Sequence, residues 1–340
     1  MTTQYSGVVS ELGIDQATEV IGVTSTFRRI REEREKCRAS SKARAYTFYG
    51  HEHPRLHDFF AIYLLDNEGG RKEIVVGDRR LVFHRTEAPE DTDVETLVQT
   101  GAIPVCVGDG PFSKVAKVTQ EHSVTRNVAR FLGLLGDPVY QQLIDWSHGV
   151  EERGAGPFTE TAGIIRLLSL AQMDNPSGVY DTVEKMIDAR RAEIIEEQKA
   201  NQDLENGLVE LEAHYHGRTI KIGAVVSSAP LIARQARKRG IDVLVRKDPA
   251  TGHGLVTAKA GIRLANSVAC LRVEEAKLAG QPPPSNPQRP GLAGTEDRWV
   301  YKREQMESVI NGGWIAPDLP ATAMDIQTLA TLVTMGLEGG

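Results

Sequence analysis

The sequence predicts an α/β protein with a mainly parallel sheet in an N-terminal domain, a long connecting helix and a smaller α/β C-terminal domain. From residue 45 onward, short strand-like stretches alternate with helical apolar stripes. Such alternation implies crossover connections, and hence parallel strands with helices on both faces. A long charged amphipathic stretch follows and then a second alternating region. The length of 340 residues suits two domains.

The first α/β domain is expected over residues 45–178, after a helical extension over 1–44. Short apolar runs rich in β-branched and aromatic residues predict strands at 45–49, 73–76 and 103–107. Apolar residues at helical spacing predict helices at 56–65, 94–99, 123–135, 139–146 and 159–172.

A single helix over 179–216 is expected to connect the two domains, because its apolar residues recur at roughly helical spacing between charged ones. The smaller domain is expected over 217–279, with strands at 219–226, 242–246 and 254–258 and helices at 230–239 and 262–275. A proline-rich linker over 280–296 and a C-terminal extension over 297–340, ending in a helix at 325–337, complete the expected organisation.

Composition argues against several classes of protein. No window approaches the roughly 18 apolar residues of a membrane span, and the N-terminus lacks a basic-then-apolar signal pattern. The three cysteines are far apart and show neither disulfide nor zinc spacing, which favours a reducing cytoplasm. A net charge of −6 excludes a globally basic nucleic-acid binder but not a local basic patch. The sequence holds no Gly-x-Gly-x-x-Gly, Walker lysine or Gly-x-Ser-x-Gly motif.

Positive charge is concentrated over residues 28–44. The basic residues there are Arg28, Arg29, Arg31, Arg34, Lys36, Arg38, Lys42 and Arg44, offset only by three glutamates. Two interpretations stay open. The stretch is either a solvated helix face with ion pairs between successive turns, or an arm that contacts nucleic acid.

The most informative segment, GHEHPRLHD over residues 50–58, lies between the first predicted strand and the helix after it. Ligand sites in open parallel sheets form at the carboxyl ends of strands. Imidazole and carboxylate groups bind zinc, manganese or iron, and a helix that begins near Arg55 favours an anion. The candidate metal ligands are His51, His53, His57 and Asp58. In the alternative, His57 and Asp58 only cap the helix.

This segment resembles the first motif of the DHH phosphoesterase superfamily, which includes RecJ-type exonucleases and small-molecule phosphodiesterases. His51 and Pro54 match the motif, whereas Arg55 and His57 stand at its two aspartate positions. The stretch IPVCVGDG over 103–110 is similar to the region of the family's second carboxylate, with Asp109 as the candidate ligand. The Asp-His-His motif that names the superfamily is absent, and Glu121-His122 come nearest to it.

The resemblance also implies that the smaller domain closes over the active-site cleft and binds substrate through a Gly-Gly-His-type loop. Thr251-Gly252-His253-Gly254 is the candidate loop, and a simple hairpin turn is the alternative. Together with residues at nearby strand ends, the substrate-binding candidates are Arg55, Ser227, Arg246, Lys247 and His253.

Our first hypothesis is a metal-dependent phosphoesterase or nuclease that acts on a nucleotide or nucleic-acid phosphodiester. One or two ions of Mn²⁺ or Zn²⁺ would lower the pKa of a bound water and stabilise the phosphoryl oxygens. The metal ligands would be His51, His53, His57, Asp58 and Asp109. The catalytic residues would be Asp58 and His122, the latter moving a proton.

A second hypothesis is a catalytically inactive relative that binds nucleic acid, a nucleotide or a protein partner. The changed motif favours it, because a two-metal site needs negative charge to hold two dications. Nucleic acid would then bind through the basic 28–44 arm. A third is a structural or assembly protein, with a homo-oligomer formed through the long helix and the C-terminal extension.

Overall fold

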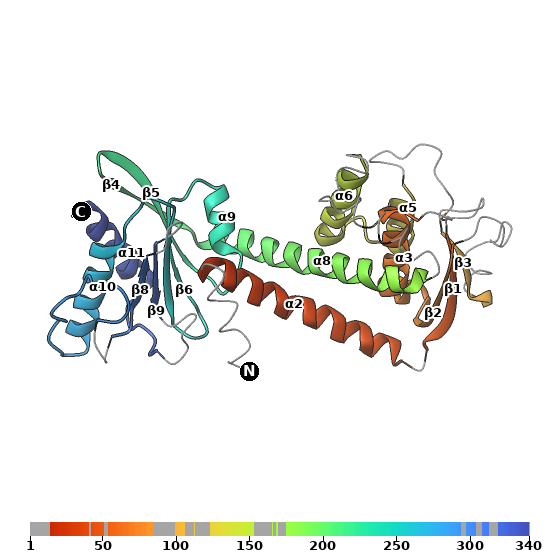
Figure 1. Cartoon of the computed structure of the whole chain (residues 1–340), viewed down its shortest axis with the longest axis horizontal. Helices are drawn as coiled ribbons and strands as arrows, with labels where there is room; N and C mark the ends of the chain where they lie inside the picture. The colour runs from red at the N-terminus through yellow and green to blue at the C-terminus, as the bar shows by residue number, and fades with distance from the viewer. Residues whose placement is uncertain are drawn as a thin grey trace. The chain divides into compact units, whose positions relative to one another are not determined.

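The computed structural model describes residues 14–40, 42–50, 54–83, 99–105, 112, 123–152, 165, 168, 175–293, 297–303, 308–312 and 319–339. The protein has an α/β fold, as predicted. One compact unit comprises Thr24–Ile195, and the other joins Met1–Val23 to Glu196–Gly340. The boundaries fall inside helices α2 (Ile14–Arg38) and α8 (Pro176–Gly207), so each helix belongs to both units (Figure 1). We call them the parallel-sheet unit and the mixed-sheet unit.

The parallel-sheet unit, Thr24–Ile195, contains a three-stranded sheet of order β2-β1-β3 in which both neighbouring pairs are parallel. Its strands are β1 (Arg44–Tyr49), β2 (Val76–Val82) and β3 (Ala102–Pro104). The first and third overlap the predicted strands. The second begins where the predicted strand over 73–76 ends, because Glu73 has φ 64° and ends the 3-10 helix η2 (Gly69–Lys72).

Helices α3 (Leu56–Glu68), α5 (Val124–Leu132) and α6 (Pro138–Glu152) lie together beside this sheet (Figure 1). α3 is buried on almost every side, since its residues from Phe59 to Leu65 are all buried. It packs against α5 and α6 and forms the centre of the unit's core. The predicted helices over 94–99 and 159–172 fall largely outside the described residues.

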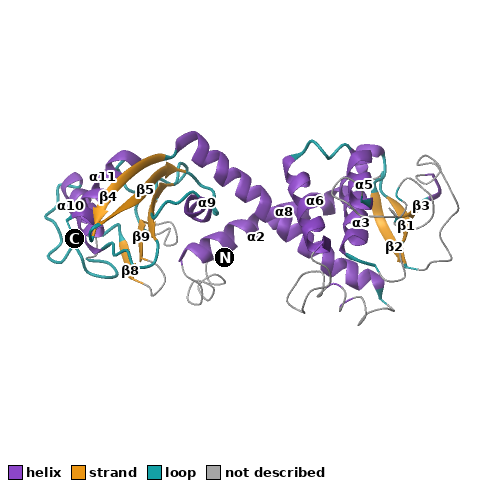
Figure 2. Cartoon of the chain, turned by 90° about the horizontal axis from the view of Figure 1, so that it is seen from above, coloured by secondary structure: helices purple, strands orange, loops and turns teal. Residues whose placement is uncertain are grey.

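The mixed-sheet unit contains a six-stranded sheet of order β4-β5-β6-β7-β9-β8, in which only β5 and β6 run parallel. Its strands are β4 (Val209–Tyr215), β5 (Arg218–Val226), β6 (Val243–Lys247), β7 (Gly254–Ala258), β8 (Val300–Arg303) and β9 (Ser308–Gly312). Helices α10 (Ala265–Leu278) and α11 (Ile326–Glu338) lie on one side of the sheet and α9 (Ile232–Lys238) on the other (Figures 1 and 2).

The expected helix over 179–216 is too long at its C-terminal end. α8 ends at Gly207, and residues 209–215 form β4. Side chains alternate along this strand, with Ala213 and Tyr215 buried and His214 between them exposed, which is the period of a strand. His216 and Gly217 both have positive φ, 47° and 77°, which suits the two-residue turn to β5.

The expected linker and C-terminal extension are instead parts of the mixed-sheet unit, because β8, β9 and α11 complete its sheet and core. The buried guanidinium of Arg272 holds the proline-rich loop. It donates 2.7 Å hydrogen bonds to the carbonyl oxygens of Pro287, Arg289 and Trp299. Its Nε lies 2.7 Å from Asp297 Oδ2. The stretch is therefore anchored to α10, unlike a linker.

Among the described residues, no helix is both long and apolar enough to cross a membrane.

Candidate functional site

The carboxyl edge of the three-stranded parallel sheet is the first candidate site. From β1 the chain crosses to β2 on one side, and it later returns to β3 on the other side of β1. Ligands of open α/β sheets bind where the strand order reverses in this way. The ends of β1 and β3 are joined directly, since Val105 N donates a 2.7 Å hydrogen bond to Tyr49 O. Four of the predicted ligands and catalytic residues, His51, His53, Asp109 and His122, lie outside the described residues.

The first turn of α3 follows β1 at this edge. Asp58 is buried, and its Oδ2 accepts a 2.7 Å hydrogen bond from the backbone N–H of Arg55. Its other oxygen, Oδ1, lies 3.3 Å from His57 Nε2. Asp58 therefore caps α3, as the alternative interpretation expected, while one carboxylate oxygen still faces an imidazole. Arg55 is exposed beside them.

The start of α5 is joined to the start of α3. Thr125, which is fully buried, donates a 3.1 Å hydrogen bond from its hydroxyl to the carbonyl oxygen of His57. Ser123 caps α5 by accepting a 3.1 Å bond from Arg126 N. Because Ser123 directly follows Glu121-His122 in the chain, the helix that this pair precedes begins next to the first turn of α3.

His148 of α6 is a buried histidine that sequence reasoning missed. Its Nε2 lies 3.1 Å from the hydroxyl oxygen of Ser123. The two residues are 25 positions apart on different helices, so no motif spacing relates them. The signal that could have found it is a histidine in register with the apolar residues Leu143 and Ile144 on the buried face of its helix.

The described residues alone do not complete a metal site. Among them, no three His, Cys, Asp or Glu side chains lie close enough to hold one ion. His57 and Asp58 are brought together at 3.3 Å, and the remainder of the predicted ligand set lies outside the described residues. The metal set therefore remains a prediction.

In the mixed-sheet unit, two predicted substrate-binding residues have internal partners at the carboxyl ends of β5 and β6. Buried Ser227 donates a 2.5 Å hydrogen bond to Asp203 Oδ2 and accepts one of 2.9 Å from Ala229 N. Arg246 is also buried, and its Nη1 donates to Ala229 O at 3.3 Å. These contacts shape the loop that joins β5 to α9.

Two other candidates flank the loop from β6 to β7: Lys247 is the last residue of β6, and His253 directly precedes β7. This loop joins antiparallel strands and so forms a hairpin loop, while its role toward substrate stays a prediction. Lys247 Nζ donates a 2.6 Å hydrogen bond to Met324 O, and His253 Nε2 lies 2.9 Å from Leu319 O. Both side chains therefore contact main-chain carbonyl groups that precede α11.

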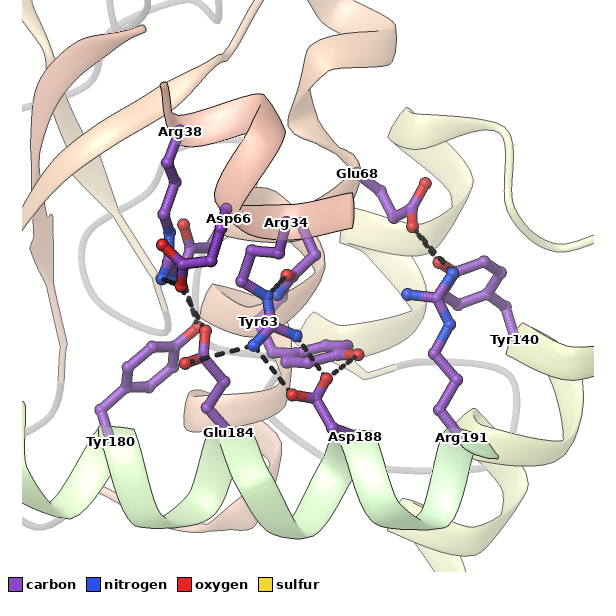
Figure 3. Close-up of polar contacts among 12 residues, drawn as sticks. Arg34, Arg38, Tyr63, Asp66, Glu68, Tyr140, Tyr180, Glu184, Asp188 and Arg191 are labelled. Atoms are coloured by element: carbon purple, nitrogen blue, oxygen red, sulfur yellow. Dashed lines mark hydrogen bonds and ion pairs between the residues drawn. The ribbon is translucent and has the colours of Figure 1, made fainter. Parts of the chain in front are cut away.

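A network of ionised groups within the parallel-sheet unit explains part of the basic 28–44 stretch (Figure 3). Arg34 is buried and donates a 2.8 Å hydrogen bond to Asp188 Oδ2. Arg38 donates to Asp66 at 2.8 Å and to Glu184 at 3.0 Å. Two members of the predicted nucleic-acid-binding arm thus form internal ion pairs, because acidic residues of α3 and α8 face them.

The acidic partners on α8 are spaced by one helical turn, so Tyr180, Glu184 and Asp188 point to the same side (Figure 3). Burial raises the pKa of Glu184 above its usual 4.5, although Arg34 and Arg79 oppose this effect. For Arg34, burial lowers the pKa, but Asp188 and Glu184 outweigh it and the pKa rises. Arg34 therefore stays charged inside the unit.

No family model matches the chain, and no curated protein matches its sequence. The resemblance to the DHH phosphoesterase superfamily therefore stays an expectation drawn from the motifs.

Proposed function

We propose that the protein is a metal-dependent hydrolase of phosphodiesters in a nucleotide or nucleic acid, with its catalytic centre at the carboxyl edge of β1 and β3. The observation that carries the proposal is the reversal of strand order at β1. The chain passes from Gly50 into the segment that holds His51 and His53, and from Val105 into the segment that holds Asp109. Both segments start from neighbouring parallel strands.

Two further contacts support a catalytic centre at this edge of the sheet. Asp58 and His57 stand 3.3 Å apart at the start of α3, and Thr125 fixes the start of α5 against His57. A divalent ion held by imidazole and carboxylate groups would lower the pKa of a bound water and stabilise the phosphoryl oxygens. His122, which stands next to the capping residue of α5, is the proposed proton-transfer group.

The test is hydrolysis of bis(4-nitrophenyl) phosphate by EDTA-treated protein, before and after addition of Mn²⁺. We expect Mn²⁺ to restore activity, and His51→Ala to lower kcat/KM by at least about tenfold. His214→Ala is the matched control, because His214 is exposed on β4 in the mixed-sheet unit. The proposal fails if no metal restores hydrolysis, or if the two variants are equally active.

Binding of nucleic acid without turnover is a second candidate, favoured by the exposure of Arg28, Arg29 and Arg31 on α2. Reversal of all three charges to glutamate is expected to weaken oligonucleotide binding and to reduce its salt dependence. The control reverses three exposed basic residues of the mixed-sheet unit, Arg263, Lys277 and Lys302. Equal losses in both triple variants would contradict a specific role for α2.

A further inference from the structure

Residues 319–324, which we call the strap, lead into α11 and contact the side chains of Lys247, the last residue of β6, and His253 in the β6–β7 loop. Lys247 Nζ donates to Met324 O at 2.6 Å and to Thr322 O at 3.4 Å. His253 Nε2 lies 2.9 Å from Leu319 O, and since a carbonyl oxygen only accepts, the ring nitrogen donates. Three carbonyl oxygens of the strap thus face two donors.

The carbonyl oxygens of the strap and the oxygens of a phosphate are both hydrogen-bond acceptors for Lys247 and His253. A lysine ammonium has donors only, and an imidazole Nε2–H likewise requires an acceptor. A phosphate that approaches Lys247 and His253 must therefore compete with hydrogen bonds that already exist. The strap is close to the loop as well, because a Cβ on Gly252 would lie 3.2 Å from the Cβ of Ala321.

We propose that the strap is an internal competitor that occupies the phosphate-binding donors of the mixed-sheet unit and that a phosphate-containing ligand displaces. This regulation rests on the proposed function, and the role of Lys247 and His253 toward phosphate is the substrate-binding role that the sequence resemblance implies. The apparent affinity for the ligand is then the intrinsic affinity multiplied by the fraction of molecules in which the strap is released.

A second set of contacts holds the strap in place and does not involve Lys247 or His253. Arg298 Nη1 donates to the carbonyl oxygen of Ala321, and Arg298 Nε lies 3.5 Å from Glu275. Thr322 donates a 2.8 Å hydrogen bond from its hydroxyl to Glu275 Oε2. Substitution of Arg298 therefore loosens the strap and leaves Lys247 and His253 in place.

The test measures binding of a fluorescein-labelled thymidine octanucleotide to the full chain, with inorganic pyrophosphate as competitor. Arg298→Met removes a positive charge, which on electrostatic grounds alone weakens the binding of an anion. The strap proposal predicts the opposite change in affinity: the dissociation constant of Arg298→Met should be about three- to tenfold lower than that of the unchanged protein. The matched control is Arg263→Met, an exposed arginine of the same unit, for which equal or slightly weaker binding is expected.

Hydrogen–deuterium exchange provides a second readout. The amide of Met324, which donates to the Thr322 hydroxyl at 3.1 Å, is expected to exchange faster when the octanucleotide is bound. Arg298→Gln replaces the methionine variant if thermal unfolding shows that the latter is not folded. The proposal is overturned if the Arg298 variant binds no more tightly than Arg263→Met, or if neither binds, or if saturating octanucleotide leaves exchange in the strap unchanged.

Failure of the strap and failure of the proposed function give different results. Loss of Mn²⁺-dependent hydrolysis by the unchanged protein counts against the proposed function. Intact hydrolysis combined with unchanged affinity in Arg298→Met counts against the strap alone.

Discussion

Arg34 and Asp188 form a buried ion pair between α2 and α8, in which Arg34 Nη1 donates a 2.8 Å hydrogen bond to Asp188 Oδ2. The carboxylate also accepts a 2.9 Å hydrogen bond from the hydroxyl of Tyr63 on α3. One buried acidic side chain therefore binds partners from two other helices. Because removal of one partner leaves the other charge buried and unpaired, this contact tests how the parallel-sheet unit is held together.

Arg34→Met is expected to lower the free energy of unfolding by about 3–5 kcal/mol, because it leaves the Asp188 carboxylate buried without its ion-pair partner. Urea unfolding followed by circular dichroism measures the change. Arg28→Met on the same helix is the control, because Arg28 is exposed and its loss should cost less than about 0.5 kcal/mol. Combining Arg34→Met with Asp188→Leu should recover part of the loss, and equal costs for the two arginine variants would contradict the prediction.

Thr125→Val is expected to cost about 1 kcal/mol of stability, because it removes the hydrogen bond that joins the starts of α3 and α5. Thr182→Val is the control, since Thr182 is exposed and, among the described residues, its hydroxyl donates only to Gly178 O within its own helix. If the carboxyl edge of the sheet is the catalytic centre, Thr125→Val also lowers Mn²⁺-dependent hydrolysis. Thermal unfolding that is equally affected by both variants would argue against this role.

Gly336→Ala sets helix propensity against packing. Alanine favours a helix interior over glycine by about 1 kcal/mol. A Cβ at position 336 would, however, lie 2.4 Å from the backbone N and Cα of Ser267, where α11 crosses α10. Overpacking of this kind costs about 1–3 kcal/mol, so we expect net destabilisation in urea unfolding. At Gly207, a Cβ meets nothing within 4 Å, and Gly207→Ala should be neutral or stabilising. A stabilised Gly336→Ala variant would refute the close contact.

Asp242 makes the stability of the mixed-sheet unit depend on pH in the acidic range. Burial alone would raise the pKa of Asp242, but the hydrogen bond from Lys221 N and the 3.0 Å contact with Lys259 outweigh it and hold the pKa below 3.8. The charged carboxylate thus stabilises the folded state above pH 3.8, and this contribution is lost as the pH falls through the lowered pKa. Asp242→Asn is expected to lower the slope of stability against pH between about pH 5 and pH 2. An unchanged slope would show that this contact contributes nothing.

Local patterns in the sequence predict most elements of the fold, and tertiary pairing explains the exceptions. The alternation of Leu211, Ala213 and Tyr215 with polar residues was visible, and Asn206-Gly207 just before it is a helix-ending signal. The long helical pattern was nevertheless extended through both, because apolar residues continue at spacings that a helix also allows. The second strand of the parallel sheet begins later than its apolar run, because Glu73 adopts a left-handed backbone conformation. Strand β9 lies between β7 and β8 because it pairs with residues of β7 at least fifty positions earlier, which no local window contains.

The candidate site was predictable only in part. Histidines that follow a strand pointed to the carboxyl edge of the parallel sheet, and the order of its strands agrees with that choice. The partners of Lys247 and His253 could not be predicted, because they are main-chain carbonyl groups about seventy residues away. Arg34 was counted with its exposed neighbours because charge composition does not indicate that Asp188, 154 positions later, is buried against it.

The position of α11 has a consequence for biosynthesis. This helix supplies Leu329, Val333 and Leu337 to a core that covers strands β4, β5 and β6, all translated much earlier. Those strands leave the ribosome with an exposed apolar surface, and the part of their native cover that α11 supplies is complete only after residue 337 has been added. Chaperones that recognise exposed hydrophobic segments therefore have a window in which to act on this half of the nascent chain.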